Sequence, residues 1–399
     1  MDSRNRRRIG IAGAVAGVGA AGVGAAVGLR RLAVGRVRLR PDPDADEPFG
    51  TLRGEELTVL ADDDLPLHVE IDGAGAGAAA DLTVVFCHGY TLNQDAWHYQ
   101  RRDLRGLRMV FWDQRSHGRS GRSDPLRATI EQTGEDLYAV LTAAAPEGPV
   151  VLVGHSMGGM SIMALADRHP ELFGDRVVGA ALVNTSCGDL AELTLGLPLV
   201  LAKLVRPLAP RALRGLGRRA DLVDRARGLS ADLAFVVTRK MAFADKQVSP
   251  TVVDFLEQLI RATPIDVIAE FYPALAGHDK AAALEAMGRV PVLVLAGGKD
   301  RLTPAAHGRR IAEALPDAEL VEVDEAGHVL PLEYPGVVTG GLRRLIARAR
   351  PGRDESGRDE SGRDESGRDE SGRDESGRDE SGRDEPGRDE PGRNEERTA

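Results

Sequence analysis

The chain has 399 residues, 42% of them hydrophobic, and a formal net charge of −10 at pH 7. The first 40 residues carry +8 and the residues from 352 onward carry −8, so the body between them carries the whole net negative charge. An acidic body argues against nucleic acid as a partner. The body, roughly 300 residues long, can bury a large core, and two cysteines in so long a chain do not suggest a disulfide scaffold.

A weakly apolar segment opens the chain. Residues 9–29 are 21 uncharged residues, seven of them glycine and seven alanine, with arginines on both sides. The segment is long enough to span a bilayer, and Arg7-Arg8-Ile9-Gly10-Ile11 loosely resembles a twin-arginine export signal. Residues 1–40 are therefore predicted to be a membrane anchor or an export signal, making the protein membrane-associated or exported. If the segment is neither an anchor nor an export signal, the protein is expected to be cytoplasmic.

Two apolar runs predict the first buried strands. The run 82–87 ends at His88-Gly89-Tyr90, where the glycine lets the chain fold back. The backbone N–H of Tyr90 is thereby a candidate donor to a substrate oxyanion. The run 107–112 ends in the polar segment 113–120, which we interpret as a structural turn that ties loops together by hydrogen bonds.

The next apolar run, 149–153, leads into Gly154-His155-Ser156-Met157-Gly158, and a helical pattern follows over 159–166. A G-x-S-x-G turn between a strand and a helix presents its serine as a nucleophile. Glycines two residues either side allow strand and helix to pass closely. Because the first N–H groups of a helix are unpaired, the N–H of Met157 is the second candidate oxyanion donor.

After the strand predicted at 177–184, about a hundred residues show helical periodicity and few strand signals. This segment, 189–288, is predicted to be a helical cap. Some of its apolar side chains are expected to line a pocket for an acyl or aromatic group above Ser156. Its phenylalanines are Phe235, Phe243, Phe255 and Phe271.

A serine nucleophile needs a base and an acid that orients the base. His328 follows the predicted strand 318–323 and is the candidate base, since sites of this kind place serine, acid and histidine in that order. Asp300 follows the apolar strand 290–296 and is the favoured acid, because residues just past parallel strands converge at one edge of the sheet. Asp324 and Glu325, on the loop of His328 itself, are the alternatives.

The segment 352–399 repeats Gly-Arg-Asp-Glu-Ser six times, followed by close variants. The repeats contain no apolar residue that could nucleate packing. The tail is therefore predicted to be disordered.

The motifs around His88-Gly89-Tyr90, 113–120, Ser156, Asp300 and Gly327-His328 together resemble the α/β-hydrolase family over about residues 57–350. The resemblance implies an α/β fold with an eight-stranded, mostly parallel sheet flanked by helices and a helical cap inserted after strand six. Together with the unusual composition of the two ends, the resemblance divides the chain into the segment 1–40, a core in two parts (41–188 and 289–351), the cap at 189–288, and the tail 352–399.

Three further residue-level expectations accompany the resemblance. Ser116 stands where relatives usually carry glycine, which affects a loop and leaves the triad assignment intact. Ser156 argues against the family branches that use an aspartate nucleophile. In the family's sheet order, Cys87 and Cys187 are expected to be too far apart to pair.

The sequence thus predicts an enzyme, a serine hydrolase with the triad Ser156, Asp300 and His328 and the oxyanion donors Tyr90 and Met157. The expected substrate is a small or medium apolar carboxylic ester, cleaved through an acyl-enzyme without a metal or organic cofactor. Peptidase or amidase, thioesterase, carbon–carbon bond hydrolase and cofactor-free perhydrolase activities are alternatives on the same triad. A slow-turnover ligand sensor is the alternative of another class. The oligomeric state is left open.

Overall fold

The computed structural model describes residues 41–73, 81–190, 239–245 and 247–350. The predicted anchor or export signal at 9–29, the repeat tail, and Phe235 of the predicted cap lie outside the described residues. No helix in the described part of the chain is long and apolar enough to cross a bilayer.

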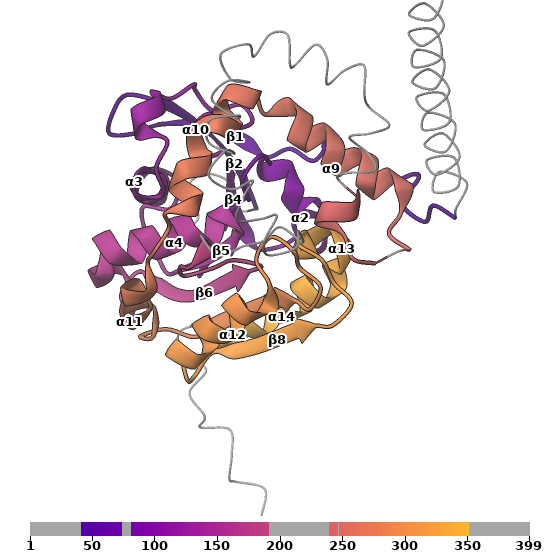
Figure 1. Cartoon of the computed structure of the whole chain (residues 1–399). Coiled ribbons are helices and arrows are strands. Elements are labelled where there is room, and N and C mark those ends of the chain that lie inside the picture. The colour runs from indigo at the N-terminus through magenta and orange to yellow at the C-terminus, as the bar shows by residue number, and fades with distance from the viewer. Residues whose placement is uncertain (1–40, 74–80, 191–238, 246, 351–399) are drawn as a thin grey trace, which may run out of the picture. The chain divides into compact units, whose positions relative to one another are not determined.

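The described residues contain one eight-stranded sheet (Figure 1). Its strands are β1 (Glu55–Leu60), β2 (Pro66–Asp72), β3 (Thr83–Cys87), β4 (Arg108–Trp112), β5 (Val150–His155), β6 (Val177–Val183), β7 (Val292–Gly297) and β8 (Glu319–Val323). The order across the sheet is β1-β2-β4-β3-β5-β6-β7-β8. β2 pairs antiparallel with β1 and with β4, and the other neighbours are parallel. The predicted eight-stranded, mostly parallel sheet is thereby confirmed.

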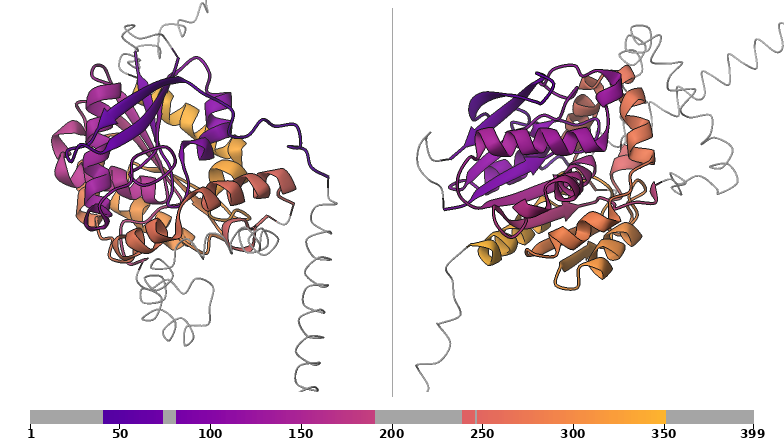
Figure 2. Two further views of the ribbon diagram at one scale, coloured as in Figure 1. Left: turned by 90° about the horizontal axis from the view of Figure 1, so that it is seen from above. Right: turned by 90° about the vertical axis from the view of Figure 1, so that its left-hand side faces the viewer.

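Helices flank the sheet on both sides (Figure 2). The helices of the described residues are α2 (His98–Asp103), α3 (Ile130–Ala144), α4 (Met157–Arg168), α9 (Pro250–Ala262), α10 (Ile265–Ala276), α11 (Leu284–Met287), α12 (Ala305–Ala314), α13 (Leu330–Glu333) and α14 (Pro335–Ala349). Short 3-10 turns lie at Gln94–Trp97, Pro125–Arg127, Pro170–Leu172 and Ala281–Ala283.

The central strands read as continuous apolar runs because helices cover both faces of the sheet. Every residue of β3, β5 and β7 is buried. In β5, Val150 and Leu152 join the hydrophobic cluster that includes residues of α3 and α4. Val151 and Val153 join the cluster on the other face, which includes residues of α14. Alternate side chains of one strand thus supply two separate cores.

The parallel strands end at one edge of the sheet, and the polar residues that follow them meet there. Ser156 follows β5, Asn184 follows β6, Asp300 lies in the turn after β7, and His328 lies in the loop after β8. This edge is the place that the sequence predicts for the active site.

The described part of the predicted cap is helical. It contains α9, α10, one 3-10 turn and α11. Leu284 and Met287 of α11 belong to the same hydrophobic cluster as residues of α4. α11 therefore packs into the core of the sheet domain. A cap inserted after strand six remains a prediction, because residues 191–238 lie outside the described part of the chain.

The segment 41–53, which we call the N-terminal strap, connects α9 with α2. Asp42 accepts hydrogen bonds from the side chain of Ser249 and from the backbone N–H of Thr251, at the start of α9. Phe49 stacks on Phe255 of α9, with ring centroids 4.6 Å apart, and meets Tyr99 of α2 edge-on. The strap therefore fixes α9 against the sheet domain.

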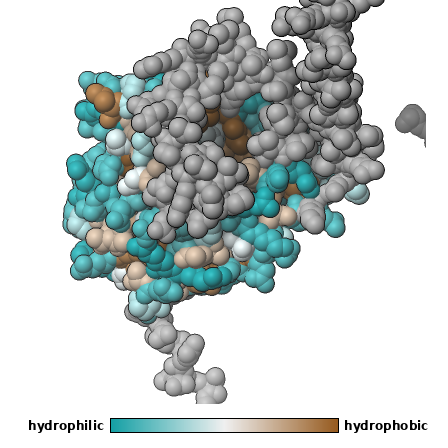
Figure 3. All heavy atoms as spheres, viewed as in Figure 1, coloured by the Kyte–Doolittle hydropathy of each residue, from teal (hydrophilic) through white to brown (hydrophobic). Residues whose placement is uncertain are grey.

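The described surface on the face drawn in Figure 3 is mostly hydrophilic. Within the described ranges, the exposed large hydrophobic side chains are Leu60, Leu126, Tyr138 and Leu320. Single exposed apolar residues of this kind are normal in folded proteins.

Candidate active site

Ser156 occupies the sharp turn between β5 and α4. Its backbone has φ 52° and ψ −117°, a conformation that residues other than glycine rarely adopt. The turn is possible because Gly154 and Gly158 carry no side chain. A Cβ on Gly158 would lie 2.1 Å from the Cys87 carbonyl oxygen, and one on Gly154 would lie 2.5 Å from the Gly159 nitrogen. The close passage of strand and helix that the sequence predicts is therefore present.

The structure brings Ser156, His328 and Asp300 together. The Nε2 atom of His328 lies 3.1 Å from the Ser156 hydroxyl oxygen, and its Nδ1 atom lies 2.8 Å from Oδ2 of Asp300. All three residues are buried. The carboxylate can only accept, so Nδ1 carries the proton and the Nε2 lone pair faces the serine. Asp324 and Glu325, the alternative acids, are both exposed.

Two residues that the sequence analysis missed hold Asp300 in place. Thr303 donates to Asp300 through its hydroxyl, at 2.8 Å, and through its backbone N–H, at 2.9 Å. Asn184 donates from Nδ2 to Oδ2 of Asp300 at 3.0 Å and to the carbonyl oxygen of His328 at 2.9 Å. Asn184 also follows a parallel strand, so the reasoning that selected Asp300 could have selected it.

The electrostatic surroundings keep Asp300 ionised. Burial alone would raise the pKa of Asp300, but charge interaction and hydrogen bonding with His328, together with the hydrogen bonds from Thr303, outweigh it. The net result is a pKa below the usual value. An ionised Asp300 can stabilise the imidazolium that forms when His328 takes up a proton.

The two candidate oxyanion donors lie beside the serine. Within the described residues, neither the backbone N–H of Tyr90 nor that of Met157 has a hydrogen-bond acceptor. Met157 is fully buried. A Cβ on Gly89 would lie 3.3 Å from Cβ of Ser156, so the turn before Tyr90 runs directly against the nucleophile. N–H groups that have no acceptor among the described residues are suited, at this position, to receive negative charge.

The polar segment 113–120 ties loops together. The backbone N–H of Gln114 donates to Nε2 of His88 at 2.9 Å, and the Gln114 side chain donates to the His88 carbonyl at 2.6 Å. Arg115 makes two hydrogen bonds of 2.6 Å to Asp136, and both side chains are buried. Burial lowers the pKa of His88 to about 4, which keeps its ring neutral. These contacts match the structural role expected of the segment.

Ser116, the departure from the family pattern, has φ +63°. A glycine adopts this conformation without steric cost, which explains the preference for glycine. The serine hydroxyl compensates locally, since it accepts hydrogen bonds from the Ser123 backbone at 2.9 Å and from Arg122 at 3.2 Å.

The other histidines after Ser156 have structural partners. His169 stacks on Tyr138, with ring centroids 4.1 Å apart. Ring nitrogens of His278 and His307 contact the carbonyl oxygen and the hydroxyl of Ser186, at 3.0 Å and 2.8 Å. Both cysteines, Cys87 and Cys187, are free and buried.

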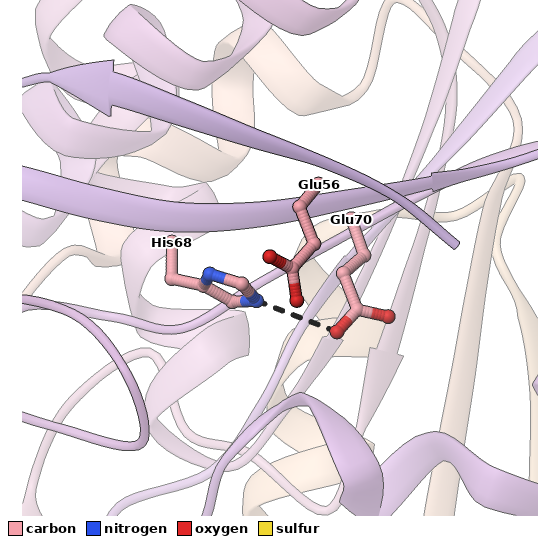
Figure 4. A group of neighbouring side chains, drawn as sticks. All are labelled: Glu56, His68 and Glu70. Atoms are coloured by element: carbon pink, nitrogen blue, oxygen red, sulfur yellow. Dashed lines mark hydrogen bonds and ion pairs between the residues drawn. The ribbon is translucent and has the colours of Figure 1, made fainter. Parts of the chain in front are cut away.

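A cluster on β1 and β2 could in principle hold a metal ion. Glu56, His68 and Glu70 lie with their potential ligand atoms within 4.8 Å of one another (Figure 4). Arg101 and Arg119, however, both form ion pairs with Glu70. Burial would raise the pKa of Glu70, but a backbone N–H and the two arginines hold it at about 2. The two arginines already neutralise the Glu70 carboxylate, so we interpret the cluster as part of an ion-pair network.

A mostly parallel sheet with a strained serine between a buried strand and a helix defines the α/β-hydrolase class of fold. A model of the alpha/beta hydrolase family matches residues 84–339, more than half of the chain, and the chain belongs to this family.

Several relatives of the chain carry the names of hydrolases. The chain is 30% identical over 235 residues to a monoacylglycerol lipase of Mycolicibacterium smegmatis, covering 58% of this chain and 74% of the relative. It is 28% identical over 283 residues to 3-oxoadipate enol-lactonase 2 of Acinetobacter baylyi, covering 70% and 94%. A thermophilic esterase from Thermogutta terrifontis has a similar structure, with a TM-score of 0.59 and 24% identity over 74% of this chain and 100% of its own. The chain is accordingly a hydrolytic enzyme.

Proposed function

We propose that this protein is a serine hydrolase that cleaves carboxylic esters through a covalent acyl-enzyme. The observation that carries the proposal is the position of the His328 ring, which lies within hydrogen-bonding distance of both the Ser156 hydroxyl and the Asp300 carboxylate. A nucleophile, a base and an orienting acid in this arrangement activate a serine at neutral pH.

The proposed mechanism has two halves. Ser156 attacks the ester carbonyl carbon while His328 takes its proton, and the N–H groups of Tyr90 and Met157 stabilise the oxyanion. His328 then gives the proton to the leaving alcohol. In the second half His328 activates a water molecule, which attacks the acyl-enzyme and releases the acid. Asp300 keeps the histidine in the required tautomer throughout.

Two observations support an apolar ester as the substrate. The relatives named above are a lipase and an enol-lactonase, and both names denote cleavage of an ester linkage. Val267 and Phe271 of α10 belong to one buried hydrophobic cluster with Met157, the residue after the nucleophile. The apolar character of this cluster supports an apolar acyl group near Ser156.

The activity of Ser156→Ala tests the nucleophile. We expect ester hydrolysis to fall at least about a thousandfold, with the fold intact because the two side chains are similar in size. A fluorophosphonate probe should label the native protein and leave the variant unlabelled. Substantial ester hydrolysis by the purified variant would refute the proposal.

A panel of acyl chains and leaving groups tests the substrate class. Each buried methylene contributes about 0.8 kcal/mol, so kcat/KM should rise from acetyl to about butyryl or hexanoyl esters and decline before palmitoyl. Activity confined to amides, thioesters or carbon–carbon bonds would favour the corresponding alternative on the same triad. Labelling by the probe without turnover of any substrate would favour the ligand sensor.

A further inference from the structure

The turn that carries the N–H of Tyr90 is conformationally strained. Thr91, the next residue, has φ +63°, which is unusual for a β-branched residue. Strained backbone of this kind persists only where the surrounding structure holds it. On the side of the sheet domain, the ring of His88 donates to the Gly89 carbonyl at 2.8 Å, so one end of the turn is fixed by the core.

The other end of the turn is held by α10 and by Thr263, which lies two residues before that helix. The Tyr90 hydroxyl donates a hydrogen bond to the backbone carbonyl of Ile268 in α10. The Thr263 hydroxyl donates to the backbone carbonyl of Thr91 at 3.0 Å. Burial raises the pKa of the Tyr90 phenol, so the hydroxyl remains a donor.

The same helix packs on the second proposed oxyanion residue. Val267 and Phe271 are fully buried in a cluster with Met157 and Met160, and Tyr90 packs against this cluster. Each proposed donor residue, Tyr90 and Met157, therefore contacts the hydrophobic cluster to which α10 contributes.

Ion pairs fix the outer face of α10. Arg122 forms ion pairs with Asp266 at 3.0 Å and with Glu270 at 2.6 Å. Arg122 itself contacts the hydroxyl of Ser116, in the segment that also holds His88. The helix is thus attached to the sheet domain independently of the Tyr90 hydroxyl.

We propose that Thr263, Val267, Ile268 and Phe271 form a brace, the α10 brace, that sets the position of the oxyanion turn, and that the Tyr90 hydroxyl is a positioning group acting through this brace. The inference rests on the proposed function, because it assumes that the N–H of Tyr90 holds the oxyanion. Donors to an oxyanion must lie 2.7–3.1 Å from the place where the charge develops. A turn released from α10 would no longer hold the N–H there.

The test compares two tyrosines in the full-length protein. Tyr90→Phe removes only the hydroxyl and retains the ring. Tyr99→Phe is the matched control, because the hydroxyl of this largely buried side chain donates to Asp44 at 2.8 Å, in the N-terminal strap and outside the brace. We expect Tyr90→Phe to lower kcat roughly tenfold with KM changed less than about twofold. Tyr99→Phe should leave both constants nearly unchanged.

A trifluoromethyl ketone inhibitor provides a second readout, since its serine adduct places an oxyanion in the same position. Its affinity should fall in Tyr90→Phe by about the same factor as kcat/KM and stay unchanged in Tyr99→Phe. Unchanged kcat and inhibitor affinity in Tyr90→Phe, relative to Tyr99→Phe, would overturn the inference.

Thr263→Val tests the other contact of the brace, the hydrogen bond to the Thr91 carbonyl. This variant replaces Tyr90→Phe if Tyr90→Phe does not fold. It should likewise lower kcat and inhibitor affinity together, and an unchanged kcat would count against the brace. The experiment on Ser156→Ala separates the two hypotheses. If Ser156→Ala is inactive while both brace variants behave like the control, the brace fails and the proposed triad stands.

Discussion

Four residues around the site adopt backbone conformations that side chains rarely allow. Thr91, Ser116, Ser156 and Asn184 all have φ between 43° and 63°. Each such residue costs on the order of 1–3 kcal/mol and persists where its surroundings fix it. Here the surroundings are hydrogen bonds, since Asn184 contacts Asp300 and Ser116 accepts from Ser123. The hydrogen bonds that position these polar side chains therefore also hold the strained backbone at this edge of the sheet.

The identity of the acid can be tested with Asp300→Asn. The Asp300 carboxylate accepts hydrogen bonds from Asn184, Leu302, Thr303 and His328. An amide would direct N–H groups at one of these donors and would favour the wrong tautomer of His328. We expect kcat to fall roughly 10³–10⁴-fold, measured with an ester on which the native enzyme is active.

Asp324→Asn is the control for that experiment. Asp324 is exposed, and its replacement should leave kcat within roughly twofold of the native value. If the two variants had the reverse effects, the acid would be Asp324 rather than Asp300.

At the scale of elements, the nucleophile turn depends on how closely β3 and α4 approach. A Cβ on Gly158 would meet the carbonyl oxygens of Cys87 and His88 at 2.1 Å and 2.8 Å. Backbone atoms of a buried strand do not move aside easily, so Gly158→Ala should lower the free energy of unfolding by about 3 kcal/mol. Urea unfolding measures the change.

Gly340→Ala is the matched control, since Gly340 also lies inside a helix, α14. The nearest atom to its Cβ would be the side-chain Nη1 of Arg344, at 3.9 Å. Alanine favours the helix, so this variant should gain up to about 1 kcal/mol. If the two substitutions changed the free energy of unfolding equally, the close approach of β3 and α4 would not determine stability at Gly158.

The N-terminal strap gives a second prediction at this scale. Phe49→Ala removes a ring that stacks on Phe255 and meets Tyr99 edge-on. We expect a loss of about 2 kcal/mol in the free energy of unfolding. Leu126, whose side chain is 87% exposed, should tolerate alanine within about 0.5 kcal/mol. A Phe49→Ala protein as stable as Leu126→Ala would mean that the strap does not hold α9.

For the whole molecule, buried histidines should make folding sensitive to acid. Burial lowers the pKa of His88 and His278 to about 4, and that of His117 and His155 to about 3. The unfolded chain, with ordinary histidine pKa values, binds more protons below about pH 6.5. The free energy of unfolding should therefore fall as the pH falls from about 6.5 toward 4, by up to about 1.4 kcal/mol per pH unit for each histidine.

Urea unfolding at pH 7.5, 6.5 and 5.5 measures this dependence. His117→Gln retains a donor for the Arg115 carbonyl, which the ring of His117 contacts at 2.9 Å, and removes one titrating group. It should reduce the slope below pH 6.5 by up to about 1.4 kcal/mol per pH unit. Stability that does not change between pH 7.5 and 5.5 would contradict the prediction.

The sequence alone determined most of the sheet. Five strands were recognisable as apolar runs that end in polar or glycine-containing turns, and the buried strands β3, β5 and β7 are the clearest of them. β8 was recognisable as a strand although it contains two glutamates. The edge strands β1 and β2 were implied only by the family resemblance. They contain exposed and charged residues, so no apolar run distinguishes them. The positions of Ser156, Asp300 and His328 after strands were also readable, because turn chemistry lies in neighbouring residues.

Only the tertiary structure showed which further polar groups meet the predicted triad and the oxyanion turn. Asn184 and Asp300 are 116 residues apart, and Tyr90 and Ile268 are 178 residues apart. Local patterns of burial and turn formation are encoded within a few residues, so a sequence displays them directly. Hydrogen bonds between distant segments depend instead on how strands and helices pack, which brings Asn184 to Asp300 and α10 to the Tyr90 turn.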